Sequence, residues 1–216
     1  TGLVMHVFTK DYPGKELVLA IRGSDNLADW TGPNVAVMRD GDLLELMNLP
    51  GPATRHTRAQ FRRLQEILLP GDAWDPQFRD ALDFAREVER TYGAQGYEIK
   101  VAGHSGGGAH GQVIAHTFGW EGRTFDAPGA ANIIQSKGYS AWLAANGIEP
   151  AGVPAYRPDP FVSGFLNYTV NNSAVAYNTG PHLGQRQQIS SYAGREGFGS
   201  KARHAAGIIG GGIGNT

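Results

Sequence analysis

The sequence contains no cysteine. This absence excludes disulfides, cysteine nucleophiles and thiolate metal sites within these 216 residues, and it leaves the redox compartment open. Long apolar runs are also missing, because no stretch approaches the roughly 18 residues needed to span a bilayer. The first residues, TGLVMHVF, lack the basic and apolar regions of a signal peptide, so both a secreted and a cytoplasmic location stay open.

A large charge of one sign is absent as well. The chain has 19 Lys and Arg against 20 Asp and Glu, a formal net charge of −1, and the basic residues are scattered. Such a chain has no cluster of basic residues to which the phosphates of a nucleic acid could bind, so we expect no nucleic-acid partner. The spacings typical of metal ligands and phosphate loops are missing too. We therefore expect no metal and no organic cofactor.

The chain does have an alternation of strand-like and helix-like segments. Strand patterns occupy residues 16–21 and 97–102, residues 123–129 resemble a strand that ends in a loop, and 166–170 with 174–177 resemble a further strand and its exit. Helix patterns occupy 77–92 and 112–118. Asp75 and Pro76 provide an N-cap and a first-turn proline for the first helix. This alternation of strands and helices predicts an α/β fold with a mostly parallel sheet. We expect one domain over residues 1–206, followed by a flexible glycine-rich tail at 207–216.

Two stretches interrupt this rhythm, residues Leu46–Trp74 and Ile134–Phe161. Long insertions are often lids or binding loops, and the alternative is that both are surface excursions. The first contains an amphipathic basic run at Thr57–Leu69. A segment of this kind can close with its apolar face over an acyl pocket and open at a lipid surface, so we expect transient contact with lipid.

The strongest chemical signal is the motif Gly103-His104-Ser105-Gly106-Gly107 between a predicted strand and a predicted helix. A nucleophile on a sharp strand-to-helix turn needs glycines on both sides, because the backbones crowd together there. The following helix N-terminus favours developing negative charge. The alternative is a glycine-rich surface turn. The sequence context favours Ser105 as a nucleophile.

Four segments together resemble the class 3 lipase family, and they are closer to its bacterial lipase-like branch. These are VLAIRGSDNLADW, GHSGGGAHG, TFDAPGA and NTGPHLG, in the expected order between Glu16 and Gly184. The resemblance implies an α/β-hydrolase fold with helices on both faces of the sheet. It also implies cleavage of a small-molecule or lipid ester, such as an acylglycerol or phospholipid, by a Ser-Asp-His triad.

The oxyanion of an acyl-transfer intermediate needs two preorganised donors. One comes from the residue after the nucleophile, here Gly106, and one from an earlier loop. In the resembling family the earlier donor is the Ser or Thr of an R-G-[ST] turn, which here is Ser24. The alternative for Ser24 is an ordinary turn serine.

The base of such a site must be a histidine, whose ordinary pKa lies near the working pH. The sequence points to His182 in Gly180-Pro181-His182-Leu183-Gly184, which resembles the family's ending. The other histidines precede the nucleophile, share its helix or lie in the tail; they are His6, His56, His110, His116 and His204. The remaining one, His104 inside the motif, is expected to point into the fold.

The sequence differs from the family pattern at the position of the triad acid. The usual carboxylate position before the histidine reads Asn171-Asn172-Ser173. Asp126, at the end of the strand after the nucleophile, and Asp159, in a later loop, are the candidate acids. A dyad assisted by Asn172 or Ser173 is the third possibility, and Asp126 has a structural alternative as the cap of the turn at Gly129.

Two classes of function follow from these residues. The first is a serine carboxylic ester hydrolase, a lipase, phospholipase or esterase. The second is a catalytically inactive hydrolase-fold module that binds a ligand as part of a larger secreted or effector protein. The missing carboxylate favours the second, whereas the presence of Ser105, His182, Ser24 and the motif glycines favours the first.

Overall fold

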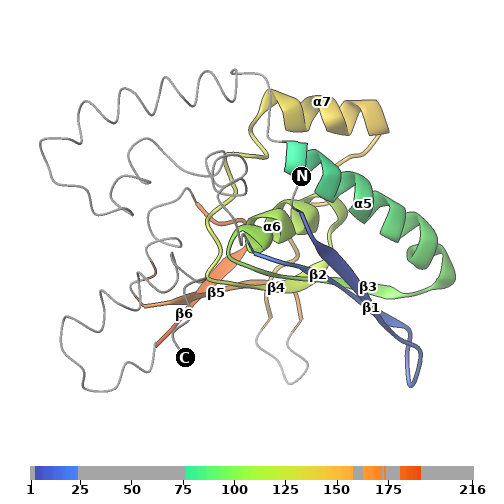
Figure 1. Cartoon of the computed structure of the whole chain (residues 1–216), viewed down its shortest axis with the longest axis horizontal. Helices are drawn as coiled ribbons and strands as arrows, with labels where there is room; N and C mark the ends of the chain where they lie inside the picture. Colours follow the sequence, from blue (N-terminus) through green and yellow to red (C-terminus); the bar gives the residue numbers. More distant parts are fainter. Residues whose placement is uncertain (1–2, 24–75, 158–162, 172, 174–180, 191–216) are drawn as a thin grey trace, which may run out of the picture.

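The centre of the molecule is a six-stranded sheet (Figure 1). The computed structural model describes residues 3–23, 76–157, 163–171, 173 and 181–190. The strands are β1 (Met5–Lys10), β2 (Glu16–Ile21), β3 (Glu98–His104), β4 (Glu121–Phe125), β5 (Phe165–Val170) and β6 (Gln185–Ile189), and they lie side by side in that order. β1 is antiparallel to β2, and all the other pairs are parallel. The predicted α/β class with a mostly parallel sheet is confirmed.

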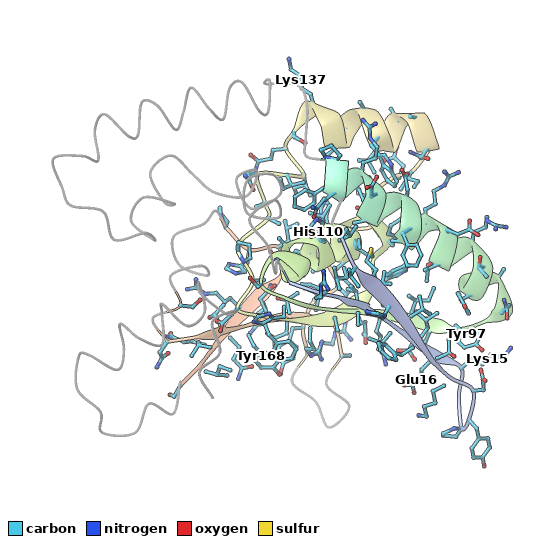
Figure 2. The ribbon with its side chains drawn as sticks, in the orientation of Figure 1. Lys15, Glu16, Tyr97, His110, Lys137 and Tyr168 are labelled. Atoms are coloured by element: carbon cyan, nitrogen blue, oxygen red, sulfur yellow. The ribbon has the colours of Figure 1, made fainter. Side chains whose placement is uncertain are left out.

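The α-helices of the described residues are α5 (Pro76–Tyr92), α6 (Gly106–Phe118) and α7 (Lys137–Asn146), and a short 3-10 helix, η1 (Gly93–Gln95), follows α5. All three α-helices lie on one side of the sheet in Figure 1. Tyr168 of β5 lies on the opposite side from His110 of α6 (Figure 2). The second helical layer that we expected on the other face is not found among the described residues.

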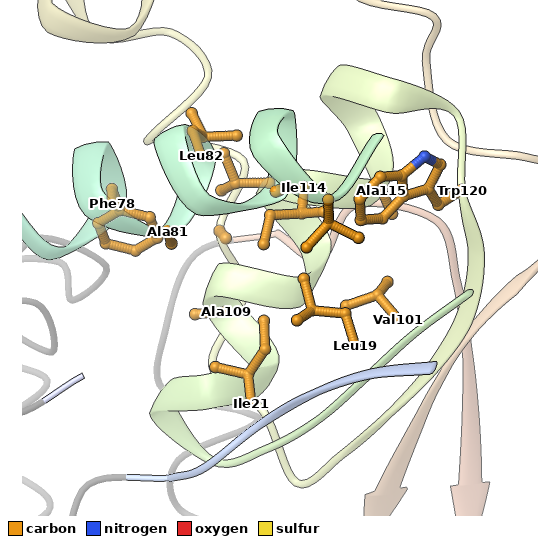
Figure 3. Close-up of a cluster of buried hydrophobic side chains, with 14 of the residues drawn as sticks. Leu19, Ile21, Phe78, Ala81, Leu82, Val101, Ala109, Ile114, Ala115 and Trp120 are labelled. Atoms are coloured by element: carbon orange, nitrogen blue, oxygen red, sulfur yellow. The ribbon is translucent and has the colours of Figure 1, made fainter. Parts of the chain in front are cut away.

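The core forms between the sheet and these helices (Figure 3). The alternation in β2 buries Leu17, Leu19 and Ile21 on the helix side and leaves the residues between them partly exposed. α5 buries the face that carries Phe78 and Leu82, and α6 is buried along almost its whole length. α5 is thus amphipathic, with one face in the core, whereas the nearly buried α6 carries few charged residues.

Several boundaries agree with the sequence pattern. β2 spans the predicted residues, and α5 begins at Pro76 and ends at Tyr92 as expected. α6 begins six residues earlier than predicted, at Gly106, because its first turn is built from glycines, which carry little helical signal.

Three elements escaped the sequence analysis. α7 lies inside the stretch expected to be a lid, loop or surface excursion; Ser136 caps it by accepting a hydrogen bond from Tyr139 N. β1 and β6 are the two edge strands. β6, with the sequence QRQQI, is exposed at every residue and therefore lacks the apolar alternation of a strand. The expected lid, the predicted segment at 174–177 and the tail at 207–216 lie outside the described residues.

Candidate active site

Ser105 occupies the single residue between the end of β3 and the start of α6. Its backbone has φ of 51° and ψ of −130°, a conformation that L residues rarely adopt. A non-glycine residue held in such a region carries strain of roughly 1–3 kcal/mol, which the surrounding structure must offset. The Ser105 N–H donates to Phe125 O at 3.0 Å, so the turn is fixed to the end of β4. A serine held in this way is a candidate functional residue.

The glycines of the motif are required by close backbone contacts. A Cβ on Gly103 would lie 2.4 Å from Gly107 O, and a Cβ on Gly107 would lie 2.4 Å from the carbonyl oxygens of Ile21 and Arg22. Neither position has space for a side chain. The turn therefore packs directly on the end of β2, as the sequence analysis expected for a strand-to-helix turn of this type.

The Gly106 N–H is suited to stabilise an oxyanion. Gly106 is the first residue of α6, where an N–H has no partner within the helix. The carbonyl of the same peptide unit, Ser105 O, accepts from Gly108 N at 2.9 Å and from Ala109 N at 3.4 Å. Hydrogen bonds to a carbonyl polarise its peptide and strengthen the N–H on the other side.

The second predicted donor, Ser24, lies outside the described residues. Its neighbour Gly23 is described, and a Cβ placed on Gly23 would lie 3.2 Å from Ser105 Cβ. Gly23, two residues after β2, therefore lies beside the turn at Ser105. This is the position in which an earlier loop can supply an oxyanion donor.

His182 lies in the loop before β6 and is half-buried. Its Nε2 atom is 2.8 Å from Ala127 O. A carbonyl oxygen only accepts, so in the neutral ring Nε2 carries the proton and Nδ1 is the basic nitrogen. Burial lowers the pKa of His182 below its ordinary value of 6.5; the hydrogen bond to Ala127 raises it, and the positive charge of Arg186 lowers it. The ring is thus neutral at neutral pH and able to accept a proton.

Ser105 binds the last residue of β4, and His182 binds the segment that follows β4. Ser105 is bonded to Phe125 O, and His182 is bonded to Ala127 O, two residues later. Ala127 also packs on the nucleophile turn, since a Cβ on Gly108 would lie 2.5 Å from Ala127 Cβ. Among the described residues no hydrogen bond joins the Ser105 hydroxyl to His182, so the predicted direct contact stays a prediction.

Asp126 lies at the end of β4 with φ of 44°, and in the described part of the chain it shares a positive φ with only one other non-glycine residue, Ser105. Its Oδ1 accepts the Val170 N–H at 2.7 Å, and its own N–H donates to Tyr168 O at 2.8 Å. Asp126 thereby joins the ends of β4 and β5. Within the described ranges it has no hydrogen bond to His182, so its role as the triad acid also stays a prediction.

Asp159 was the second candidate acid, and Asn172 or Ser173 the possible partner of a dyad. Asp159 and Asn172 lie outside the described residues. Ser173 is buried, and its N–H donates to Val170 O at 3.1 Å.

Two of the remaining histidines lie close to the nucleophile turn. The expectation that His104 points into the fold was wrong, since the end of β3 leaves this side chain exposed. His110 is buried, as expected; its Nδ1 lies 2.9 Å from Gly106 O, and its ring stacks on Phe78. His110 therefore supports the first turn of α6 from inside the core.

Sequence reasoning missed two fully buried amides, Gln112 of α6 and Asn167 of β5. Both bind the backbone of Leu183, the residue after His182. Their signal was present but weak: a lone Gln or Asn inside an apolar segment marks a buried amide that needs partners.

The described residues contain no group of three or more His, Asp or Glu placed to hold a metal ion. Of the helices described, none has the length and apolar character required to cross a membrane. No protein-family model matches this chain, and no curated protein is significantly similar to it.

Proposed function

We propose that this chain is a serine carboxylic ester hydrolase with Ser105 as nucleophile and His182 as base, built on an α/β-hydrolase fold. The observation that carries the proposal is the strained backbone of Ser105 between β3 and α6, beside the Gly106 N–H, which has no partner within α6. The neutral, partly buried imidazole of His182, bonded to the adjacent Ala127, supports it.

The reaction follows from these groups. Ser105 Oγ attacks the acyl carbonyl carbon while His182 Nδ1 takes the hydroxyl proton, and Gly106 N–H with Ser24 stabilises the oxyanion. The carbon–oxygen bond to the alcohol breaks, the alcohol leaves with the proton from His182, and an acyl-enzyme remains. Water then attacks the acyl-enzyme, His182 takes its proton and returns it to Ser105, and the carboxylic acid is released.

Asp126 is the acid that we propose for this site, with a modified role. Ala127 O already fixes the tautomer of His182, which in Ser-His-Asp triads is the task of the carboxylate. Only Oδ1 of Asp126 is bonded to a described residue. The charge of Asp126, one residue from Ala127, is then available to stabilise the imidazolium.

A lipid ester is the proposed substrate class, and it rests on the resemblance to class 3 lipases and on the apolar residues of the Thr57–Leu69 run. Comparison of p-nitrophenyl acetate with p-nitrophenyl palmitate in detergent tests this part. Higher kcat/KM for the long acyl chain supports a lipase. Higher kcat/KM for acetate assigns the site to small soluble esters.

Labelling with a fluorophosphonate probe tests the proposal itself, because only an activated serine reacts at a useful rate. We expect the intact chain to be labelled at Ser105 and the Ser105→Ala variant not to be labelled. Absence of labelling in the folded wild-type protein would overturn the enzymatic proposal and favour the inactive binding module.

A further inference from the structure

Two side-chain amides bind the backbone of Leu183, the residue after His182, one at its N–H and the other at its carbonyl. Gln112 Oε1 accepts the Leu183 N–H at 2.9 Å, and Asn167 Nδ2 donates to Leu183 O at 2.8 Å. Both amides are fully buried. Each contact is therefore costly to lose, since a buried amide or peptide group left without a partner destabilises the fold.

Each amide is itself oriented by further hydrogen bonds. Gln112 Nε2 donates to Pro128 O at 2.8 Å, and its Oε1 also accepts from Ala130 N at 3.3 Å. These contacts fix which end of the amide faces Leu183. One side chain of α6, Gln112, thereby binds both the loop that follows β4 and the loop that contains His182.

Asn167 is oriented in the same manner from β5. The buried Thr124 Oγ1 donates to Asn167 Oδ1 at 2.6 Å, which directs the Asn167 NH2 group to Leu183 O and, at 3.2 Å, to Gln185 O. α6 starts at the nucleophile turn, and β4 ends at the residues that contact it. The two amides thus connect the backbone of His182 to the elements that hold Ser105.

We infer that Gln112 and Asn167 are positioning residues for His182, which set the place of the imidazole relative to Ser105. This inference rests on the proposed function, in which His182 is the base. Catalytic geometry is sensitive to such support, because a displacement of about 1 Å caused by a distant substitution can lower the rate about 100-fold. The expected effect falls on kcat, because the place of the base relative to Ser105 sets the rate of proton transfer.

The test compares Gln112→Met with Thr117→Val. Met has the length of Gln but lacks the N–H donors and the carbonyl acceptor of the amide. Thr117 is a buried polar residue of the same helix, and its partners among the described residues are Val113 O and Tyr139 Oη. We expect kcat for p-nitrophenyl butyrate to fall about 10- to 100-fold in Gln112→Met with KM changed less than about threefold. Thr117→Val should keep kcat near the wild-type value even where its melting temperature falls.

A second measurement separates positioning from general damage. In a His182→Ala background, Gln112→Met should lower the residual rate no further, because the residue through which it acts is gone. An equal loss in both backgrounds overturns the inference. Gln112→Glu retains an acceptor for the Leu183 N–H and should recover part of the kcat lost in Gln112→Met; no recovery also counts against the inference.

Hydrogen exchange gives a readout that does not depend on activity. The Leu183 amide should exchange at least about tenfold faster in Gln112→Met and in Asn167→Leu than in the wild type or in Thr117→Val. If the two variants exchange faster but fluorophosphonate does not label the wild-type protein, the missing label contradicts the proposed function. The faster exchange still supports the hydrogen bonds from the two amides to Leu183. Labelled protein whose Gln112→Met variant keeps its kcat and exchange rate would support the proposed function and overturn the inference.

Discussion

His182 Nε2 lies 2.8 Å from Ala127 O, so a backbone carbonyl holds one ring nitrogen, whereas in Ser-His-Asp triads a carboxylate holds the other ring nitrogen, Nδ1. A carbonyl fixes the tautomer as a carboxylate does, but it carries no full charge. A histidine with this partner gains less stabilisation of its protonated form. This agrees with the net lowering of the His182 pKa by burial and by Arg186.

The pH dependence of activity follows from that lowering. The base must be neutral, so kcat/KM is constant at high pH and falls as His182 protonates. Because the pKa of His182 lies below its ordinary value of 6.5, we expect the acid limb of the kcat/KM profile below pH 6.5. Arg186→Gln removes a positive charge that opposes protonation, and it should move the limb to higher pH. Arg90→Gln, which removes an exposed charge paired with Glu87, is the matched control and should leave the limb in place.

The size of the rate loss in Asp126→Asn distinguishes three roles for Asp126: a direct bond to His182, a contribution of charge alone, or a purely structural role. Loss of a carboxylate that fixes the histidine tautomer costs about 10⁴-fold in kcat. Because Ala127 O already fixes the tautomer, we expect a smaller loss of about 10- to 100-fold, from the missing charge alone. The amide still accepts the Val170 N–H, so the melting temperature should change little. A 10⁴-fold loss would indicate a direct bond to His182, and a wild-type rate would make Asp126 purely structural.

The strain at Ser105 predicts opposite effects on stability and activity. Ser105→Gly should abolish turnover and also raise the free energy of unfolding by about 1 kcal/mol relative to Ser105→Ala, because glycine adopts a φ of 51° without a Cβ penalty. Ser105→Ala removes the same hydroxyl but keeps the strained Cβ, so it is the control. Denaturant unfolding of the two inactive variants measures the difference. Equal stabilities would show that the turn stores no strain.

The sequence predicted the parts of the site that depend on local backbone geometry. The Ser105 turn, its glycines, β2, β3 and α5 all have strong local signals, either apolar periodicity or an obligatory glycine. The α/β class with a mostly parallel sheet follows from the order of these elements.

Contacts between distant segments were not predictable in the same way. The bond from His182 to Ala127 spans 55 residues, and the bond from Gln112 to Leu183 spans 71 residues. Neither residue type nor spacing specifies such partners, because many donors can meet a given carbonyl once the chain folds. The exposed edge strand β6 was missed for a related reason. Its residues carry no strand pattern of their own, and it is a strand because it pairs with β5.

Two glycines of α6 provide a matched test of the packing beneath the nucleophile. A Cβ on Gly107 would lie 2.4 Å from the carbonyl oxygens of Ile21 and Arg22, which are backbone atoms and cannot rotate away. Gly107→Ala should therefore destabilise the fold by about 2–3 kcal/mol and separate the turn from β2, with loss of esterase activity. On the same helix, a Cβ on Gly111 would lie 3.6 Å from methyl groups of Thr124 and Val101, an ordinary contact.

Gly111→Ala should accordingly be tolerated and should raise the free energy of unfolding by roughly 0.5–1 kcal/mol, because alanine is the better helix former. Thermal unfolding and the rate of fluorophosphonate labelling of both variants check the pair. If Gly107→Ala is as stable and as reactive as Gly111→Ala, then Gly107 does not lie as close to the end of β2 as described above. In that case packing does not explain the glycine at position 107, and the proposed nucleophile at Ser105 loses one of the observations that support it.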